Sequence, residues 1–281
     1  MTKVLPSALG SRPSLLGLAT LLWLPACGPP DDTDIEADLE PVTENLPTVT
    51  SRLPALLAAD EAVFGAFPGP STREQGAIMG GNRELDFVFY SLESGPFDIP
   101  TMTEYLAGIV DGAGEMEPHP LILRIPPVRD GADAAADRVA QARAAGVSGI
   151  VFPHVESGED ARAAVSAMGK GVWPDDESGS LVNFLIVEDR AGIENLDEIV
   201  QTAGASVVFA GPGDLRRAYE GDMEAVEEAI QAVLASCMAH GVACGITAGA
   251  DDIAARIEQG FRVFIVSDTE AVTLGRAAAG R

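Results

Sequence analysis

Short apolar runs alternate with helical patterns along most of this 281-residue chain, and that alternation most constrains its fold. Residues 183–214 show one unit clearly. An apolar run over 184–187 is followed by a helical pattern over 193–202 and by a second apolar run over 206–210. Both runs are short and continuously apolar, as in parallel strands that are buried on both faces. The stretch therefore predicts two parallel strands joined by a helix.

The same alternation recurs from residue 51 to residue 281. The predicted strands occupy residues 62–67, 86–91, 121–125, 149–152, 184–187, 206–210, 242–247 and 261–266. Strands that alternate with helices in this number predict an α/β fold, a (β/α)8 TIM barrel. A doubly wound open sheet is the alternative. It is disfavoured because no GxGxxG turn follows the first strand.

The first 27 residues have the pattern of an export signal rather than of a folded domain. Lys3 and Arg12 precede an apolar run over 15–24 that is too short to span a bilayer. The run ends in Leu24-Pro25-Ala26-Cys27, which resembles a bacterial lipobox. We therefore predict a lipoprotein-like signal peptide over 1–26 and lipidation at Cys27. Ordinary signal cleavage and an uncleaved anchor are the alternatives.

An acidic segment follows the signal. Residues 28–49 contain seven acids and four prolines but no Lys or Arg, so they bury too little apolar surface to fold. We predict a disordered linker over 27–50 and one barrel domain over 51–281. The protein should be exported and meet a membrane only through its lipid anchor. The net charge of −25 argues against a nucleic-acid partner.

Two further cysteines, Cys237 and Cys244, lie near a predicted helix end and strand start. In an oxidising compartment they could pair, and the alternative is a pair of buried thiols. The sequence holds no CxxC or Cys/His metal pattern.

Two carboxylates end the strands of the 183–214 unit. Glu188 follows the first strand and Asp214 the second. Parallel strands place their carboxyl ends on one side of a sheet, where α/β proteins carry their active sites. Two hard oxygen ligands suit Mg²⁺ or Mn²⁺, and two solvated loop acids are the alternative. Gly211 and Gly213 would let the backbone approach a ligand, although an ordinary tight turn is equally consistent.

Arg124 and His154 also lie at predicted strand ends. Arg124 sits in an apolar run, where it would bind a substrate carboxylate, stabilise a developing oxyanion or pair with a barrel acid. His154 has a side chain suited to acid–base chemistry near neutral pH. The alternative for His154 is a polar rim residue that is hydrogen-bonded to a neighbour such as Glu156 or Glu188.

From about residue 64 to residue 268 the chain resembles the HpcH/HpaI aldolase/citrate lyase family. The resemblance implies a (β/α)8 barrel and metal-dependent carbon–carbon bond chemistry on a small anionic 2-oxo acid. It also implies a divalent cofactor (Mg²⁺, Mn²⁺ or Co²⁺) and a possible homo-oligomer. The stretches that carry it are DFVFYSLESGPF (86–97), LILRIPP (121–127), GIVFPHVESGEDARAAV (149–165), LIVEDRAGIENLDEI (185–199) and VVFAGPGDL (207–215).

Four functional positions of the family match residues of this chain. The resemblance places the metal ligands on Glu188 and Asp214 and the transition-state-stabilising arginine on Arg124. It places a substrate-binding backbone position on Gly213, beside Gly211. These positions extend from the third predicted strand to the sixth.

Other family positions differ in this chain. Ser94 stands where the family has its general-base histidine, and Ala144 where it has the aspartate that polarises that histidine. Ile186 replaces a glutamine. His154 is the candidate replacement base. These differences leave three hypotheses. The first is a metal-dependent C–C lyase of the class II aldolase type, and the second is an exported barrel that binds an anionic metabolite without turnover. The third is a structural or assembly protein.

Overall fold

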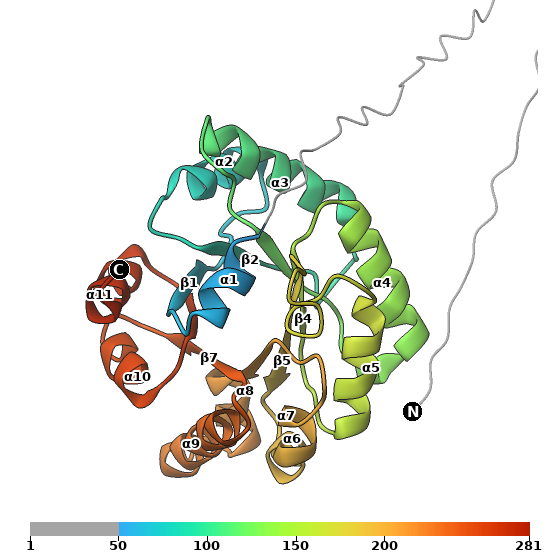
Figure 1. The fold of residues 1–281 in the computed structure, drawn as a ribbon, viewed down its shortest axis with the longest axis vertical. Helices are drawn as coiled ribbons and strands as arrows, with labels where there is room; N and C mark the ends of the chain where they lie inside the picture. The colour runs from blue at the N-terminus through green and yellow to red at the C-terminus, as the bar shows by residue number, and fades with distance from the viewer. Residues whose placement is uncertain (1–50) are drawn as a thin grey trace, which may run out of the picture. The chain divides into compact units, whose positions relative to one another are not determined.

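Eight parallel strands close into a barrel in the computed structural model, which describes residues 51–281 (Figure 1). Strand β1 pairs with both β2 and β8, so the doubly wound open sheet is excluded. The predicted signal peptide, Cys27 and the acidic linker lie outside the described residues. The strands β1 to β8 are Val63–Ala66, Phe87–Ser91, Leu121–Arg124, Gly149–Phe152, Val182–Val187, Val207–Ala210, Ala243–Ala248 and Val263–Val266.

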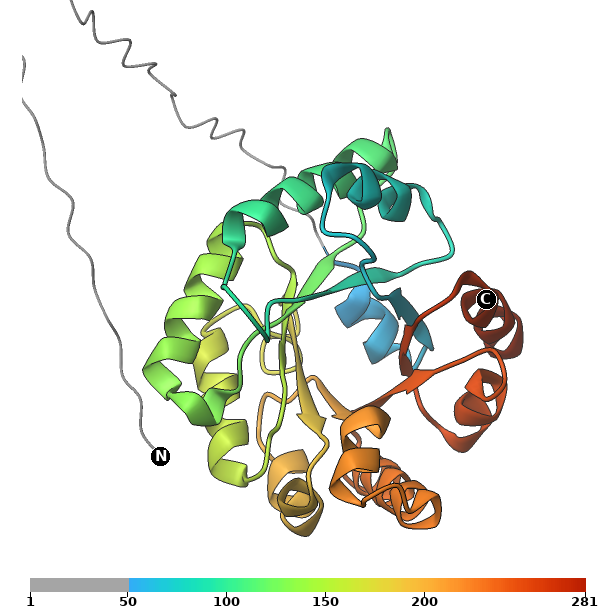
Figure 2. The ribbon, with the colours of Figure 1, turned by 180° about the vertical axis from the view of Figure 1, so that it is seen from behind.

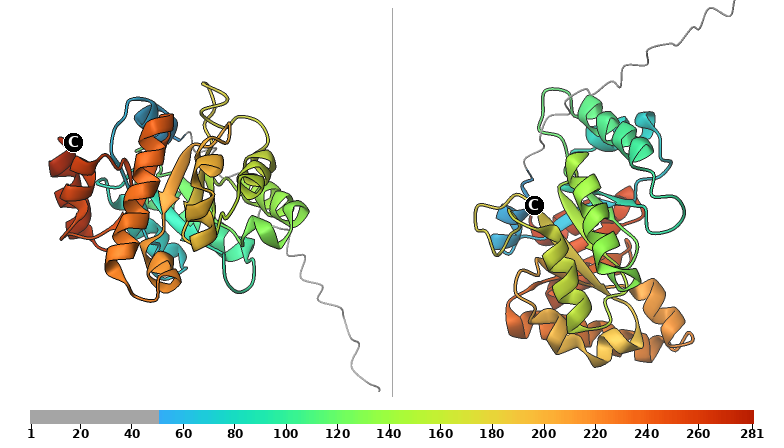
Figure 3. Two further views of the ribbon diagram at one scale, coloured as in Figure 1. Left: turned by 90° about the horizontal axis from the view of Figure 1, so that it is seen from below. Right: turned by 90° about the vertical axis from the view of Figure 1, so that its right-hand side faces the viewer.

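A ring of helices surrounds the barrel, as the views from behind and from the sides show (Figures 2 and 3). A short 3₁₀ helix, η1, spans Val128–Asp130. The α-helices α1 to α11 are Leu53–Ala58, Arg73–Gly81, Ile99–Ala113, Ala132–Ala144, Gly158–Met168, Arg190–Glu194, Leu196–Val200, Pro212–Ala218, Met223–His240, Ile253–Gln259 and Thr269–Ala279. In residues 51–281 no helix combines the length and apolarity that a membrane span requires.

Two local predictions were wrong. The helical pattern over 193–202 forms two short helices, α6 and α7, which meet at Asn195. The Asn195 side-chain amide donates to the Glu156 carbonyl, 2.9 Å away, and so ties this break to the loop after β4. The predicted turn after β6 instead opens helix α8, with Pro212 in its first turn. Proline suits that position because its fixed φ is helical and its missing N–H needs no partner there.

Side chains alternate along the strands between the barrel interior and the helix layer. In β2, Phe87 and Phe89 belong to the interior cluster, whereas Val88 and Tyr90 pack outward. Gly245 in β7 makes room inside, because a Cβ there would lie 2.2 Å from the Phe209 ring. The interior cluster comprises Leu53, Leu57, Val63, Phe87, Phe89, Ile122, Val151, Val182, Phe184, Ile186, Val207, Phe209, Val263 and Ile265.

Helix α1 and Trp173 close the amino-terminal end of the barrel. Leu53 and Leu57 of α1 are part of the interior cluster, and α1 lies across the barrel in Figure 1. Trp173 packs against the same cluster. Trp173 lies in the loop between α5 and β5, outside every strand. An aromatic side chain from a loop can fill the open end of a barrel, which periodicity within strands cannot reveal.

Cys237 and Cys244 are both buried and free, as the buried-thiol alternative predicts. Burial raises the pKa of the Cys244 thiol. Both side chains belong to the packed layer between barrel and helices.

An ion pair joins the last residue described, Arg281, to the start of β2. The Asp86 side chain is 1% exposed, and its two oxygens accept hydrogen bonds from Arg281 at 2.8 and 3.0 Å. Asp86 also accepts the Phe64 N–H of β1 at 3.0 Å, and Arg276 lies 3.6 Å away. One buried carboxylate thereby connects β1, β2 and helix α11.

We predict that Arg281→Ala lowers the free energy of unfolding by about 2–4 kcal/mol, because it leaves a buried carboxylate with weaker compensation. Urea unfolding of the wild type and the variant measures this. Arg73→Ala is the matched control, since its partners Glu104 and Asp111 are exposed and its loss should be much smaller. An equal loss of unfolding free energy in the two variants would show that the buried Arg281–Asp86 pair stabilises the fold no more than an exposed pair does.

Candidate active site

A cavity of about 300 Å³ opens at the carboxyl-terminal end of the strands. Four interior side chains form its floor, namely Phe89, Ile186, Phe209 and Ile265, each no more than 4% exposed. The remaining lining residues are Phe67, Arg124, Glu188, Gly211, Pro212, Gly213, Asp214 and Thr247. The cavity is therefore small, apolar below and charged at one side, as ligand pockets commonly are.

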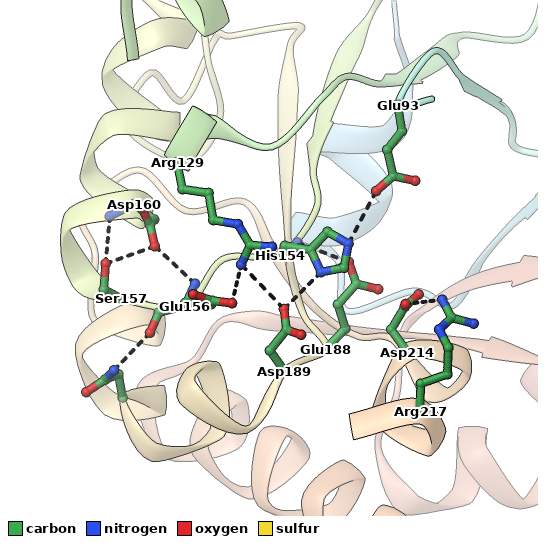
Figure 4. Close-up of polar contacts among 11 residues, drawn as sticks. Glu93, Arg129, His154, Glu156, Ser157, Asp160, Glu188, Asp189, Asp214 and Arg217 are labelled. Atoms are coloured by element: carbon green, nitrogen blue, oxygen red, sulfur yellow. Dashed lines mark hydrogen bonds and ion pairs between the residues drawn. The ribbon is translucent and has the colours of Figure 1, made fainter. Parts of the chain in front are cut away.

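Glu188 and Asp214 meet at this cavity (Figure 4). Glu188 directly follows β5 and its side chain is 3% exposed, whereas Asp214 in the first turn of α8 is 26% exposed. A Cβ at position 211 would lie 2.5 Å from Glu188 Oε2. Only glycine at that position leaves space for the Glu188 carboxylate.

The electrostatic environment of Glu188 disfavours its charged form. Burial raises the pKa of this carboxyl to about 7, and the nearby charge of Asp214 acts in the same direction. His154 and Arg124 oppose the shift, and so does the His154 backbone N–H, which donates to Glu188 Oε1 at 3.0 Å. A buried carboxylate of this kind needs a positive charge close to it.

His154 lies beside Glu188 in a strained backbone conformation, with φ at +51°. Its ring Nδ1 lies 2.8 Å from Asp189 Oδ2 and 3.6 Å from Glu188 Oε1. Its Nε2 lies 3.6 Å from Glu93 Oε1. Burial lowers the pKa of His154, but its hydrogen bond to Asp189 and the charges of Glu188 and Asp189 together raise it above its ordinary value.

Asp189 is the ring partner of His154, whereas the neighbours expected from the sequence were Glu156 and Glu188. Arg129 of η1 contacts Asp189 at 3.8 Å and also forms an ion pair with Glu156. The available signal was its position directly after Glu188, at a strand end of the barrel. Figure 4 shows this charged network around the His154 ring.

Arg124 is the last residue of β3, and three side chains of β2 and its following loop surround its guanidinium group. Its Nε donates to Ser91 Oγ at 3.0 Å, and its Nη2 lies 3.0 Å from Glu93 Oε2. Its Cζ lies 5.3 Å from the centre of the Phe89 ring. Arg124 thus pairs with an acid and faces the cavity at the same time, so both sequence interpretations describe part of its geometry.

The carboxylate pair meets the requirements of a hard divalent cation. Both residues present oxygen ligands at one cavity, and the remaining positions of such an ion are usually filled by water and substrate. Asp214 Oδ1 accepts a hydrogen bond from Arg217, whose side chain is 73% exposed and free to turn outward. Across residues 51–281 no three His, Cys, Asp or Glu side chains form a metal cluster, so this candidate centre has two protein ligands.

A profile of the HpcH/HpaI aldolase/citrate lyase family matches residues 86–267. The chain belongs to this family. A hydroxypyruvate/pyruvate aldolase of Roseovarius nubinhibens is 28% identical to it over 261 residues, which cover 83% of this chain and 96% of the relative. The family resemblance predicted from the sequence is thereby confirmed.

Solved structures of similar proteins share the barrel. A family member from Burkholderia cenocepacia superposes with a TM-score of 0.66 at 23% identity, covering 82% of this chain and 97% of that one. CitE from Mycobacterium tuberculosis, solved in complex with magnesium, acetoacetate and coenzyme A, gives 0.55 at 16% identity, with 78% and 81% covered. At these identities the likeness shows the fold, and it confirms the predicted (β/α)8 barrel.

Three positions differ in this chain from the family pattern, and two of them are exposed while the third lies in the cavity floor. Ser94 and Ala144 are both exposed, the first in the loop after β2 and the second at the end of α4. Ile186 forms part of the cavity floor. Gly213 also lines the cavity, and no atom lies within 4 Å of where its Cβ would be.

We predict that Glu188→Gln stabilises the metal-free protein at pH 8 by about 1–3 kcal/mol and changes its stability little at pH 5. The pKa of about 7 in the folded protein exceeds the usual unfolded value, so the stability linked to this group is present in acid and lost as pH rises through about 7. Urea unfolding with chelator present at both pH values measures it.

Glu258→Gln, on the exposed surface of α10, controls for the loss of one negative charge. An equal stability change at pH 5 and pH 8 for Glu188→Gln would contradict the raised pKa of the Glu188 carboxyl.

Proposed function

We propose that this chain is a metal-dependent carbon–carbon lyase that acts on a pyruvate-like 2-oxo acid or hydroxy-oxo acid. One observation carries the proposal: Glu188, Asp214 and Arg124 line the same small cavity at the carboxyl end of the barrel. Two anionic ligands opposite a cation suit a substrate that has both a carboxylate and a neighbouring carbonyl. Membership in a family of aldolases and lyases supports the same reaction type.

Glu188 and Asp214 would hold the cation, which is Mg²⁺, Mn²⁺ or Co²⁺. When bound, the ion supplies Lewis-acid polarisation of the substrate carbonyl. The magnesium in the CitE structure supports this choice of ligand chemistry. The raised pKa of Glu188 fits the same role, because a buried carboxylate without a cation is costly.

Arg124 is proposed to stabilise the negative charge that develops on the substrate oxygen. Its side chain is 24% exposed and lines the cavity, and its guanidinium group can donate hydrogen bonds to an anionic oxygen. The backbone at Gly211 and Gly213 approaches the same space without side chains, so it is proposed to contact the substrate beside Asp214.

His154 is proposed as the proton-transfer group. Asp189 accepts from Nδ1 and so leaves the Nε2 lone pair free to accept a proton. In the synthesis direction, Nε2 takes a proton from the carbon next to the substrate carbonyl, and that carbon then forms a bond to an aldehyde carbon. The proton on Nε2 passes to the new alkoxide. Cleavage follows the same steps in reverse.

A barrel that binds an anionic metabolite without turnover is the alternative. The exposed Ser94 and Ala144 favour it, because neither can remove a proton from carbon. The two functions differ in one measurable property. Both predict metal-dependent ligand binding, but only the lyase exchanges substrate protons.

We predict that the protein with Mg²⁺, Mn²⁺ or Co²⁺ exchanges the methyl protons of pyruvate with deuterated solvent, followed by proton NMR. His154→Gln should lower that rate by about 10²–10⁴-fold, because general-base catalysis contributes roughly that much. Metal-induced thermal stabilisation should survive in this variant. His240→Gln, at the carboxyl end of α9, is the matched control and should exchange like the wild type.

Ligand-induced stabilisation by oxamate without any exchange would contradict the lyase and support the binding protein. Exchange that is unchanged in His154→Gln would leave the lyase standing but remove His154 as the base.

The amino-terminal pattern supports export, with residues 1–26 removed and Cys27 lipidated. We predict that radiolabelled palmitate labels the wild-type protein in a bacterial host and does not label Cys27→Ser. Equal labelling of the two proteins would contradict the anchor. The homo-oligomer stays a prediction.

A further inference from the structure

Three residues at the end of β2 are spaced by two and all contact Arg124. Phe89 and Ser91 share one face of the strand, and Glu93 continues the spacing into the loop. Ser91 is the direct partner of Arg124 in the β2–β3 pairing. The Phe89 ring, the Ser91 hydroxyl and the Glu93 carboxylate therefore hold the guanidinium group from three directions.

Glu93 is itself held in place. Its backbone N–H donates to Ser91 Oγ at 3.4 Å, and its side chain is only 17% exposed. One carboxylate oxygen, Oε2, lies 3.0 Å from Arg124 Nη2. The other, Oε1, lies 3.6 Å from His154 Nε2, the contact drawn in Figure 4. Glu93 thus connects the two groups proposed to act on the substrate.

Arg124 needs an acidic partner such as Glu93 because two other acids lie at the same cavity. Arg124 lines the same cavity as Glu188 and Asp214, and these two carboxylates would attract an arginine that lacked another acidic partner. An arginine that paired with them would occupy the place proposed for the cation. Pairing with a third acid keeps such an arginine away from the buried Glu188 and the partly exposed Asp214.

We propose that Glu93 is a positioning residue, which holds Arg124 away from the Glu188–Asp214 pair. The proposal rests on the proposed function, in which the carboxylate pair holds a divalent cation. Glu93 competes with Glu188 and Asp214 for the guanidinium group of Arg124. Ser91 and Phe89 also contact the Arg124 guanidinium group, but they carry no charge and cannot replace Glu93.

The first test is a crystal structure of metal-free Glu93→Gln. Arg124 should leave Ser91 and form an ion pair with Glu188 or Asp214. An Arg124 side chain that stays beside Ser91 would overturn the proposal. This result depends on neither metal binding nor activity.

The second test is a double-mutant cycle on the Kd for Mn²⁺, measured by calorimetry. Glu93→Gln should weaken Mn²⁺ binding at least fivefold, and Arg124→Met combined with Glu93→Gln should restore the affinity of Arg124→Met alone. A merely structural role of Glu93 would leave the double variant as weak as the single one, and that result would overturn the proposal. Glu227→Gln is the matched control, because it removes an ion pair with Arg256 and neither residue lines the cavity.

The two proposals can fail separately. A wild-type protein that neither binds Mn²⁺ nor exchanges pyruvate protons contradicts the proposed function, and the crystal structure of Glu93→Gln still decides the position of Arg124. A wild-type protein that binds and exchanges, with Arg124 and Mn²⁺ affinity unchanged in Glu93→Gln, contradicts the role of Glu93 alone.

Discussion

A carboxylate buried at the mouth of the barrel is the constraint on which the rest of the candidate site depends. Glu188 has almost no contact with water, and its neutral form is favoured by its surroundings. The fold accommodates it through a backbone N–H from His154 and through the missing side chain at Gly211. A site that only stabilised the folded chain would gain by replacing this acid with an apolar residue. The burial of Glu188 is better explained by a bound cation, which would balance the charge of its carboxylate.

The barrel supplies the rigidity that such a site needs. Large interior side chains such as Phe89 and Phe209 fill the space below the cavity, and small residues such as Gly245 admit them. The charged residues then sit at strand ends whose positions are fixed by the pairing of neighbouring strands. Arg124 shows the principle, since its pairing partner Ser91 also accepts its guanidinium N–H. Preorganisation of this kind lets a site act without rearranging charge during the reaction.

The sequence predicted the barrel and the order of its elements because buried parallel strands and amphipathic helices leave clear periodic patterns. It also brought Glu188, Asp214 and Arg124 to one end of the barrel, since parallel strands dictate that placement. It did not identify Asp189 as the partner of His154, because this contact joins side chains at two different strand ends and their spacing along the chain does not show it. The start of α8 was missed because Gly211-Pro212-Gly213 also has the composition of a turn, although proline suits the first turn of a helix. Trp173 was missed because it packs against the core from a loop, where no periodic pattern marks a core residue.

The most direct measurement is a crystal structure of the protein soaked with Mn²⁺ and oxamate, read by anomalous scattering. We expect one ion in contact with carboxylate oxygens of both Glu188 and Asp214, with Arg217 turned away from Asp214 and oxamate facing Arg124. Anomalous density elsewhere, or Asp214 still paired with Arg217 at saturating Mn²⁺, would contradict the central claim.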